Sequence, residues 1–183
     1  MRHHFLAQAT DVFAGRGIAT YRYEFPYMQA GKSRPDSPGV AEAAVRAAVV
    51  AASHRAPELP LIAGGKSFGG RMTSQAQAHE PLPGVRGLAF FGFPLHAPGK
   101  PGTSRAEHLS KVRVPMLFLQ GTRDEFAQLD LVQQVVQGLG TLATLHLIDE
   151  GDHSFKVPKR TGKTEADVMN ELAEATVTWA TGL

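Results

Sequence analysis

The sequence LIAGGKSFGGRM, at Leu61–Met72, carries the clearest structural signal in the chain. Its first residues form a short apolar run typical of a strand, and the residues from Phe68 onward have helical spacing. Between them lies the pattern G-x-S-x-G, which places Ser67 on a tight turn from strand to helix. There a serine hydroxyl projects above the sheet edge, beside the positive end of the helix dipole. The stretch therefore predicts a nucleophilic serine, and the competing role for Ser67 is that of an N-cap.

Apolar runs of strand length recur along the chain. They lie at Ile18–Phe25, Leu59–Gly64, Val85–Phe93, Val114–Gln120 and Thr144–Ile148. Several are nearly continuous, which is typical of parallel strands covered on both faces. The segments with helical spacing are His4–Ala14, Val40–Arg55, Phe68–His79, Ser104–Val112, Leu129–Leu139 and Thr164–Trp179. This alternation predicts an α/β fold, a three-layer α/β/α sandwich with a mostly parallel sheet.

Length and composition exclude several kinds of site and binding partner. The chain has 183 residues and no cysteine, which excludes disulfides, zinc–thiolate sites and cysteine catalysis. The 19 basic and 17 acidic residues give a formal charge of +2, with the basic residues dispersed, so we expect neither nucleic-acid nor membrane binding. No apolar run reaches the length of a membrane span. We predict a single cytoplasmic domain over residues 1–183, a monomer or homodimer.

A serine becomes a nucleophile when a base and an acid lie beside it, and suitable residues follow two later runs. Asp124 ends the sequence GTRD directly after Val114–Gln120, and His153 lies in GDHSF after Thr144–Ile148. Because parallel strands end at one sheet edge, these side chains are expected to meet Ser67 there. The order serine, acid, histidine predicts a triad in which the imidazole moves the proton and the acid orients it. Other candidates for the acid are Glu125, Asp130, Asp149 and Asp152.

Other binding sites are less well supported. The letters GKS match the end of a phosphate-binding loop, but that motif requires glycine where Pro60 stands. A metal site built from the acidic residues around His153 is disfavoured because acid-rich turns are usually solvated. We expect His96 at a pocket rim or on the surface rather than as a base. No cofactor or metal is expected.

Four segments also resemble the α/β-hydrolase superfamily and, more narrowly, its small dienelactone-hydrolase-like proteins. They are RYEFPYM at Arg22–Met28, GGKSFGGRM at Gly64–Met72, QGTRD at Gln120–Asp124 and GDHSF at Gly151–Phe155. The resemblance extends from about His4 to the C-terminus and implies an α/β-hydrolase fold with its triad at the serine, aspartate and histidine already named. No insertion between Val85–Phe93 and Val114–Gln120 exceeds a short loop and helix, so we expect no cap domain.

The resemblance implies a difference near the N-terminus. In the family, a strand before the first helix ends in a loop that supplies one of two oxyanion N–H donors. That strand would lie between Ile18–Phe25 and Leu59–Gly64, and we expect a longer gene product to contain it upstream of Met1. The backbone N–H of Phe68 is then the oxyanion donor that this sequence accounts for, and loss of the other would slow catalysis about 100- to 1,000-fold.

The sequence thus predicts a serine hydrolase that acts on carboxylic esters or related acyl compounds through an acyl-Ser67 intermediate. Its partner is a small-molecule ester or acyl substrate, and the candidate pocket residues are Tyr27, Phe93 and Phe126. An acyl transferase or peptidase with the same triad is a weaker alternative. From a different class, the alternative is a catalytically inactive hydrolase-like scaffold that binds a protein partner.

Overall fold

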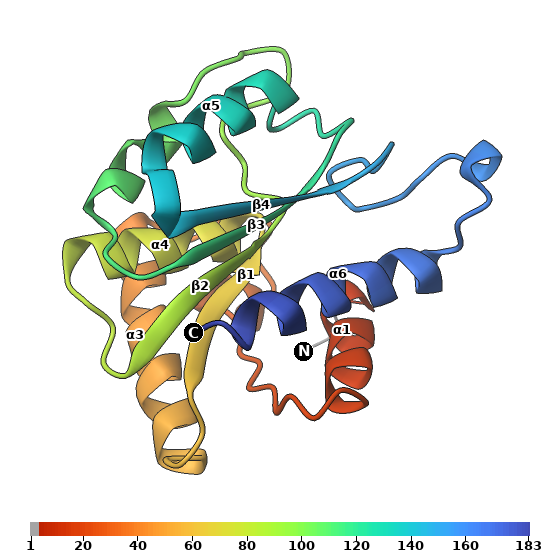
Figure 1. The fold of residues 1–183 in the computed structure, drawn as a ribbon. Coiled ribbons are helices and arrows are strands. Elements are labelled where there is room, and N and C mark those ends of the chain that lie inside the picture. The colour runs from red at the N-terminus through yellow and green to blue at the C-terminus, as the bar shows by residue number, and fades with distance from the viewer. Residues whose placement is uncertain (1–3) are drawn as a thin grey trace.

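The computed structural model describes residues 4–183 and places a four-stranded parallel sheet at their centre. The strands are β1 (Leu61–Lys66), β2 (Val85–Phe91), β3 (Met116–Gly121) and β4 (Ala143–Ile148). They lie side by side in chain order, and a helical segment connects each to the next (Figure 1). All four strands therefore end at the same sheet edge, where the loops after them come together.

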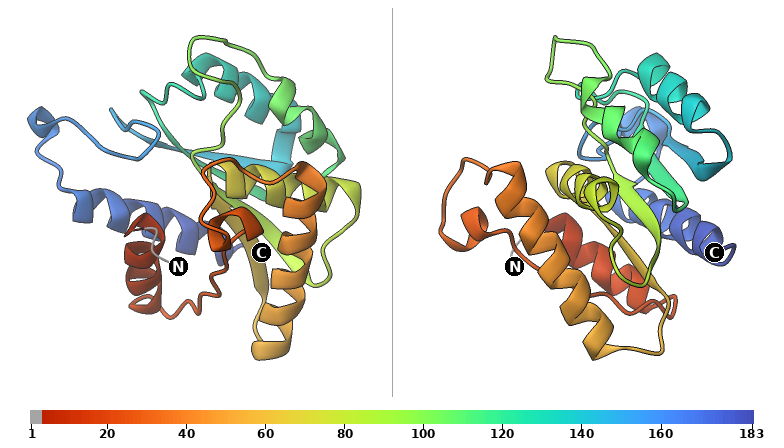
Figure 2. Two further views of the ribbon diagram at one scale, coloured as in Figure 1. Left: turned by 180° about the vertical axis from the view of Figure 1, so that it is seen from behind. Right: turned by 90° about the vertical axis from the view of Figure 1, so that its left-hand side faces the viewer.

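Helices cover both faces of the sheet, as Figure 2 shows from two further directions. One face carries α3 (Pro38–Arg55), α4 (Phe68–His79), the 3-10 helix η1 (Ser104–Lys111) and α5 (Leu129–Leu139), and the other carries α1 (His4–Ala14) and α6 (Glu165–Ala180). The predicted three-layer sandwich with a parallel sheet is confirmed. The remaining short helices are α2 (Pro26–Gln29), η2 (Gly140–Leu142) and η3 (Lys159–Thr161).

The central strands are apolar on both faces. Leu88 and Phe90 of β2 pack into the core beneath α4, while Ala89 and Phe91 pack toward α1 and α6. Successive side chains of a strand point to opposite faces, so a strand buried on both sides reads as a continuous apolar run.

The predicted strand at Ile18–Phe25 is not formed. The segment pairs with none of the four strands, and a strand depends on hydrogen bonds to a neighbour. Its aromatic side chains hold it instead: the buried Phe25 ring lies 5.4 Å from Tyr23 and 5.3 Å from Phe68 between centroids. Within the described residues, β1 is therefore an edge strand at the place where the sequence predicted a gap.

Helix boundaries follow the sequence closely, with two differences. The predicted helix at Ser104–Val112 is the 3-10 helix η1, and the loop expected after Phe25 contains α2. Pro26 begins α2, a position that suits proline because its fixed φ is helical and no N–H partner is needed. Among residues 4–183, no helix combines the length and apolar character needed to cross a bilayer.

Candidate active site

Ser67 occupies the turn between β1 and α4 in an unusual backbone conformation, with φ of 51° and ψ of −117°. A positive φ strains a non-glycine residue by about 1–3 kcal/mol, which the surrounding structure must offset. Strand and helix approach closely here, since a Cβ on Gly70 would lie 2.7 Å from the Gly65 carbonyl oxygen. The Ser67 side chain makes no N-cap hydrogen bond, so the competing structural role is not realised.

Ser67, His153 and Asp124 form one continuous chain of hydrogen bonds. His153 Nε2 lies 2.8 Å from Ser67 Oγ, and His153 Nδ1 lies 2.7 Å from Asp124 Oδ2. Donation of the Nδ1 proton to the carboxylate leaves Nε2 free to accept the proton of the serine hydroxyl. Asp124 is 4% exposed. The imidazole makes no hydrogen bond to any of the alternative acids, which are Glu125, Asp130, Asp149 and Asp152.

Gln120 holds the acid in place, a role that the sequence analysis missed. This fully buried residue near the end of β3 donates from Nε2 to Asp124 Oδ2 at 2.5 Å, and its Oε1 accepts from the Phe93 N–H at 3.0 Å. Asp124 Oδ1 accepts a further bond, from the Phe126 N–H at 2.8 Å. Both carboxylate oxygens are thus fixed. A lone polar residue within the apolar run of β3 was the signal that could have revealed it.

The loops that carry the acid and the histidine cross in contact with each other. A Cβ on Gly121 would lie 2.2 Å from the carbonyl oxygen of Gly151, so only glycine fits at this crossing. The Arg123 N–H donates to that same oxygen at 2.9 Å. Thr122 Oγ1 accepts from the Glu150 N–H at 2.7 Å. These contacts set the acid loop against the histidine loop.

Lys66, the residue before the serine, lies behind the histidine loop and was also missed. Its Nζ donates to the backbone oxygen of His153 at 2.7 Å and lies 4.9 and 5.0 Å from the ring centroids of Phe5 and Phe155. Burial lowers the pKa of Lys66 to about 8, against the opposing effect of the Asp124 and Asp152 carboxylates. The ammonium therefore ties β1, α1 and the histidine loop together. A lysine at the end of a buried strand was its visible signal.

Of the three predicted pocket residues, Phe126 packs against the histidine, whereas Tyr27 packs against Phe68, the residue after the serine. The Phe126 ring packs 4.4 Å from the imidazole of His153, and the Tyr27 ring lies 6.1 Å from Phe68, between centroids. Phe93 is different: it is 1% exposed and packs against two other core phenylalanines. Its expected place in the pocket is corrected to a place in the core. Phe68 begins α4, so its N–H has no acceptor within the helix.

His96 is buried, contrary to the expected rim or surface position, and is 5% exposed. Its Nε2 accepts from the Gln128 N–H at 3.1 Å, and its Nδ1 donates to the Ala97 oxygen at 2.9 Å. Its own N–H donates to the Phe126 oxygen at 3.0 Å. The side chain thus joins the loop after β2 to the loop of Asp124, and packing of that loop accounts for its burial.

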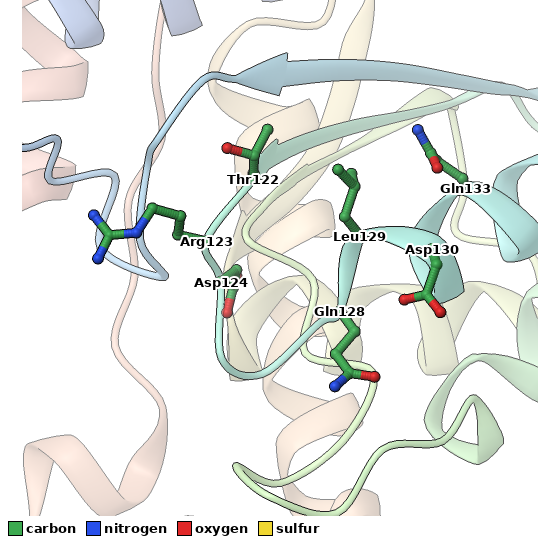
Figure 3. A pocket seen from close by; sticks show the side chains of 7 residues that line it. All are labelled: Thr122, Arg123, Asp124, Gln128, Leu129, Asp130 and Gln133. Carbon is green, nitrogen blue, oxygen red and sulfur yellow. The ribbon is translucent and has the colours of Figure 1, made fainter. Parts of the chain in front are cut away.

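An open hollow of about 560 Å³ adjoins the acid loop. Figure 3 shows the side chains around it, which belong to Thr122, Arg123, Asp124, Gln128, Leu129, Asp130 and Gln133. Neither Ser67 nor His153 lines it. The hollow therefore adjoins the acid rather than the nucleophile.

The acidic turn around His153 serves the loop itself. Asp152 Oδ1 accepts from the N–H groups of Ser154 and Lys156 at 2.7 and 2.9 Å, and Glu150 pairs with Arg160. No group of three or more possible metal ligands is found in the described part of the chain, residues 4–183.

Comparison with known proteins places the chain in a family. It is similar to an alpha-beta serine hydrolase homologue from Coxiella burnetii, with a TM-score of 0.73 and 18% identity over 97% of this chain and 76% of that one. For a serine hydrolase without a lid from Xanthomonas campestris, the TM-score is 0.73 and the identity 21%, over 98% of this chain and 75% of that one. For an esterase domain from Rhodothermus marinus, the TM-score is 0.66 and the identity 16%, over 96% of this chain and 79% of that one. The family model described as alpha/beta hydrolase domain matches residues 1–181, and the chain belongs to that family.

Proposed function

We propose that this protein is a serine hydrolase of the small dienelactone-hydrolase-like type, which cleaves carboxylic esters or related acyl compounds. The observation that carries the proposal is the hydrogen-bonded chain from Ser67 Oγ through both nitrogens of His153 to the buried carboxylate of Asp124. The descriptions of the structural neighbours, which include serine hydrolases and an esterase domain, support the same class of reaction.

The proposed reaction uses each of these groups in turn. Ser67 Oγ attacks the acyl carbon while His153 Nε2 takes its proton, and the Asp124 carboxylate stabilises the imidazolium. The Phe68 N–H and the α4 dipole stabilise the oxyanion of the tetrahedral intermediate. His153 then gives its proton to the leaving alcohol, and an acyl ester on Ser67 remains. A water molecule attacks that ester by the same proton transfers and releases the acid.

Fluorophosphonate labelling with intact-mass detection tests the proposal. We expect one covalent adduct on the wild-type protein and on the matched control Ser154→Ala, whose exposed hydroxyl lies next to the histidine, and none on Ser67→Ala. With a p-nitrophenyl ester, Ser67→Ala should lower kcat by about 10⁴- to 10⁶-fold. Labelling that survives in Ser67→Ala would contradict the assignment. A folded wild-type protein without label or turnover would favour the inactive scaffold.

A further inference from the structure

Two arginines near the candidate nucleophile have no anionic partner. Arg71 lies in α4 and Arg105 near the start of η1, and both are half-buried. Neither guanidinium makes a hydrogen bond or ion pair with any residue of the described range 4–183, and Arg71 Nε is fully buried without an acceptor. Arg46 shows the contrast, because it donates to two backbone oxygens and pairs with Glu80.

The two guanidinium groups belong to neighbouring turns of packed helices. Ser74 Oγ lies 2.7 Å from His108 Nε2, and this bond fixes α4 against η1. Arg71 precedes Ser74 by three residues, as Arg105 precedes His108, so each arginine lies about one turn before that bond. Both helices run away from the active edge, since α4 starts where β1 ends and η1 finishes shortly before β3 starts. The arginines therefore share the end nearest the serine.

The surroundings of the pair leave its charge uncompensated. Burial and the positive charge of Arg105 lower the pKa of Arg71. Burial, with Arg71 and His79 as further causes, lowers the pKa of His108 to about 4, so this imidazole is uncharged at neutral pH. Gln75 Oε1, one turn beyond Arg71, is also buried without a partner. Arg71, Gln75, Arg105 and His108 thus carry two positive charges and no negative one between them. Two of their buried polar atoms, Arg71 Nε and Gln75 Oε1, have no hydrogen-bond partner among the described residues.

Arg71 lies one turn into the helix that begins after Ser67, and Arg105 lies close enough to Arg71 to lower its pKa. The backbone N–H of Arg71 donates to the backbone carbonyl of Ser67 at 3.1 Å, so Arg71 lies one helical turn after Ser67 and their Cα atoms are about 6 Å apart along the axis. An acyl group attached to Ser67 Oγ could place a substituent a few bonds away against the guanidiniums.

We propose that Arg71 and Arg105 bind a carboxylate or phosphate group of the substrate, so that esters with a second, anionic group are preferred. This inference rests on the proposed hydrolase function. The planar fork of a guanidinium binds an oxyanion through paired charge-assisted hydrogen bonds. A bound anion also removes the repulsion between the two arginines and satisfies the buried Nε donor. A neutral ester does neither.

The first test compares p-nitrophenyl butyrate with the mono-p-nitrophenyl ester of glutarate. The ratio of their kcat/KM values should favour the anionic ester in the wild type and fall about 10- to 100-fold in Arg71→Gln and in Arg105→Gln. Arg113→Gln, an exposed arginine beyond η1 that loses the same charge, is the matched control and should keep the ratio. An unchanged ratio in the two site variants, or an equal fall in the control, overturns the inference.

Two further arms keep the test decisive. Gln75→Glu leaves both arginines in place but adds a carboxylate one turn from Arg71, so it should also lower the ratio. Calorimetric titration of Ser67→Ala protein with glutarate and with inorganic phosphate measures the site without catalysis. Binding that disappears when Arg71→Gln is added supports the site even if no ester is hydrolysed, and the tighter anion identifies the preferred group. Absence of binding by both anions overturns it, whether or not esters are cleaved.

Discussion

The acid–histidine half of the candidate site and the serine half are built differently. Both carboxylate oxygens of Asp124 and both ring nitrogens of His153 have defined partners within the protein. On the serine side, β1 is the edge of the described sheet, Ser67 is strained, and Arg71 Nε has no acceptor among residues 4–183. In the first half these polar atoms are all hydrogen-bonded within the protein, whereas the second half contains a buried donor, Arg71 Nε, that has no acceptor among the described residues. For the proposed reaction, the protein itself therefore orients the histidine, and we expect substrate selectivity to depend on the surroundings of Ser67.

Within the acid–histidine half, the largest effect is expected from Asp124→Asn, which replaces the carboxylate that both Gln120 and His153 contact. An amide cannot hold the imidazole in the tautomer that leaves Nε2 unprotonated, so kcat should fall about 10⁴-fold while the protein stays folded. Ester hydrolysis and circular dichroism measure the two quantities. Asp149→Asn, at an exposed acid outside the network, is the control. A loss of less than tenfold in Asp124→Asn would show that another residue is the acid.

Gln120→Met should have the next largest effect. The variant keeps the side-chain volume but removes the donor to Asp124 and leaves the Phe93 N–H buried without an acceptor. The free energy of unfolding should fall by about 1–3 kcal/mol, and kcat should fall about tenfold with little change in KM. Urea denaturation and ester kinetics test both. If stability falls while kcat is unchanged, Gln120 supports the fold and does not position the acid.

Lys66→Met tests the link between the two halves. Removal of the bond to the His153 oxygen should lower kcat about tenfold, with Lys66→Arg less affected because it keeps a charged donor. Because burial lowers the pKa of Lys66 from 10.5 to about 8, the unfolded chain binds a proton between these values that the folded chain has lost. The free energy of unfolding contributed by this residue therefore rises with pH across that window.

Urea denaturation at pH 7 and pH 9.5 measures this slope as the difference between wild type and Lys66→Met. The wild type should gain stability relative to the variant at the higher pH. A difference that is the same at both pH values would show that the lysine titrates normally, and an unchanged kcat would remove its positioning role.

The smallest effect is expected from Thr164→Ala, which lies outside the hydrogen-bonded chain of Ser67, His153 and Asp124. Thr164 and Asp167 form a capping box at the start of α6. Loss of the cap should cost about 1 kcal/mol of unfolding free energy and about 2–4 °C in Tm, with unchanged ester turnover. Thr178→Ala, at an exposed position within α6, is the control in thermal melts. A change in kcat for Thr164→Ala would mean that α6 influences the site.

The sequence predicted what local pattern determines. The helices α1, α4 and α5 lie where their apolar spacing placed them, and the serine, acid and histidine follow strands that apolar runs made visible. The strand expected at Ile18–Phe25 failed because pairing depends on a distant neighbour that no local pattern reports. Phe93 and His96 were misplaced because burial in a loop depends on the segments that pack over it.

The turn at Ser67 has a consequence for attempts to make this protein more robust. Its φ of 51° suits glycine better than any residue with a side chain, so the residue with the least backbone strain at this turn has no hydroxyl. A search for thermostable variants that measures melting alone would therefore select Ser67→Gly, which lacks the hydroxyl of the proposed nucleophile. Selection at this position must score catalysis and stability together, because here the two requirements oppose each other within a single residue.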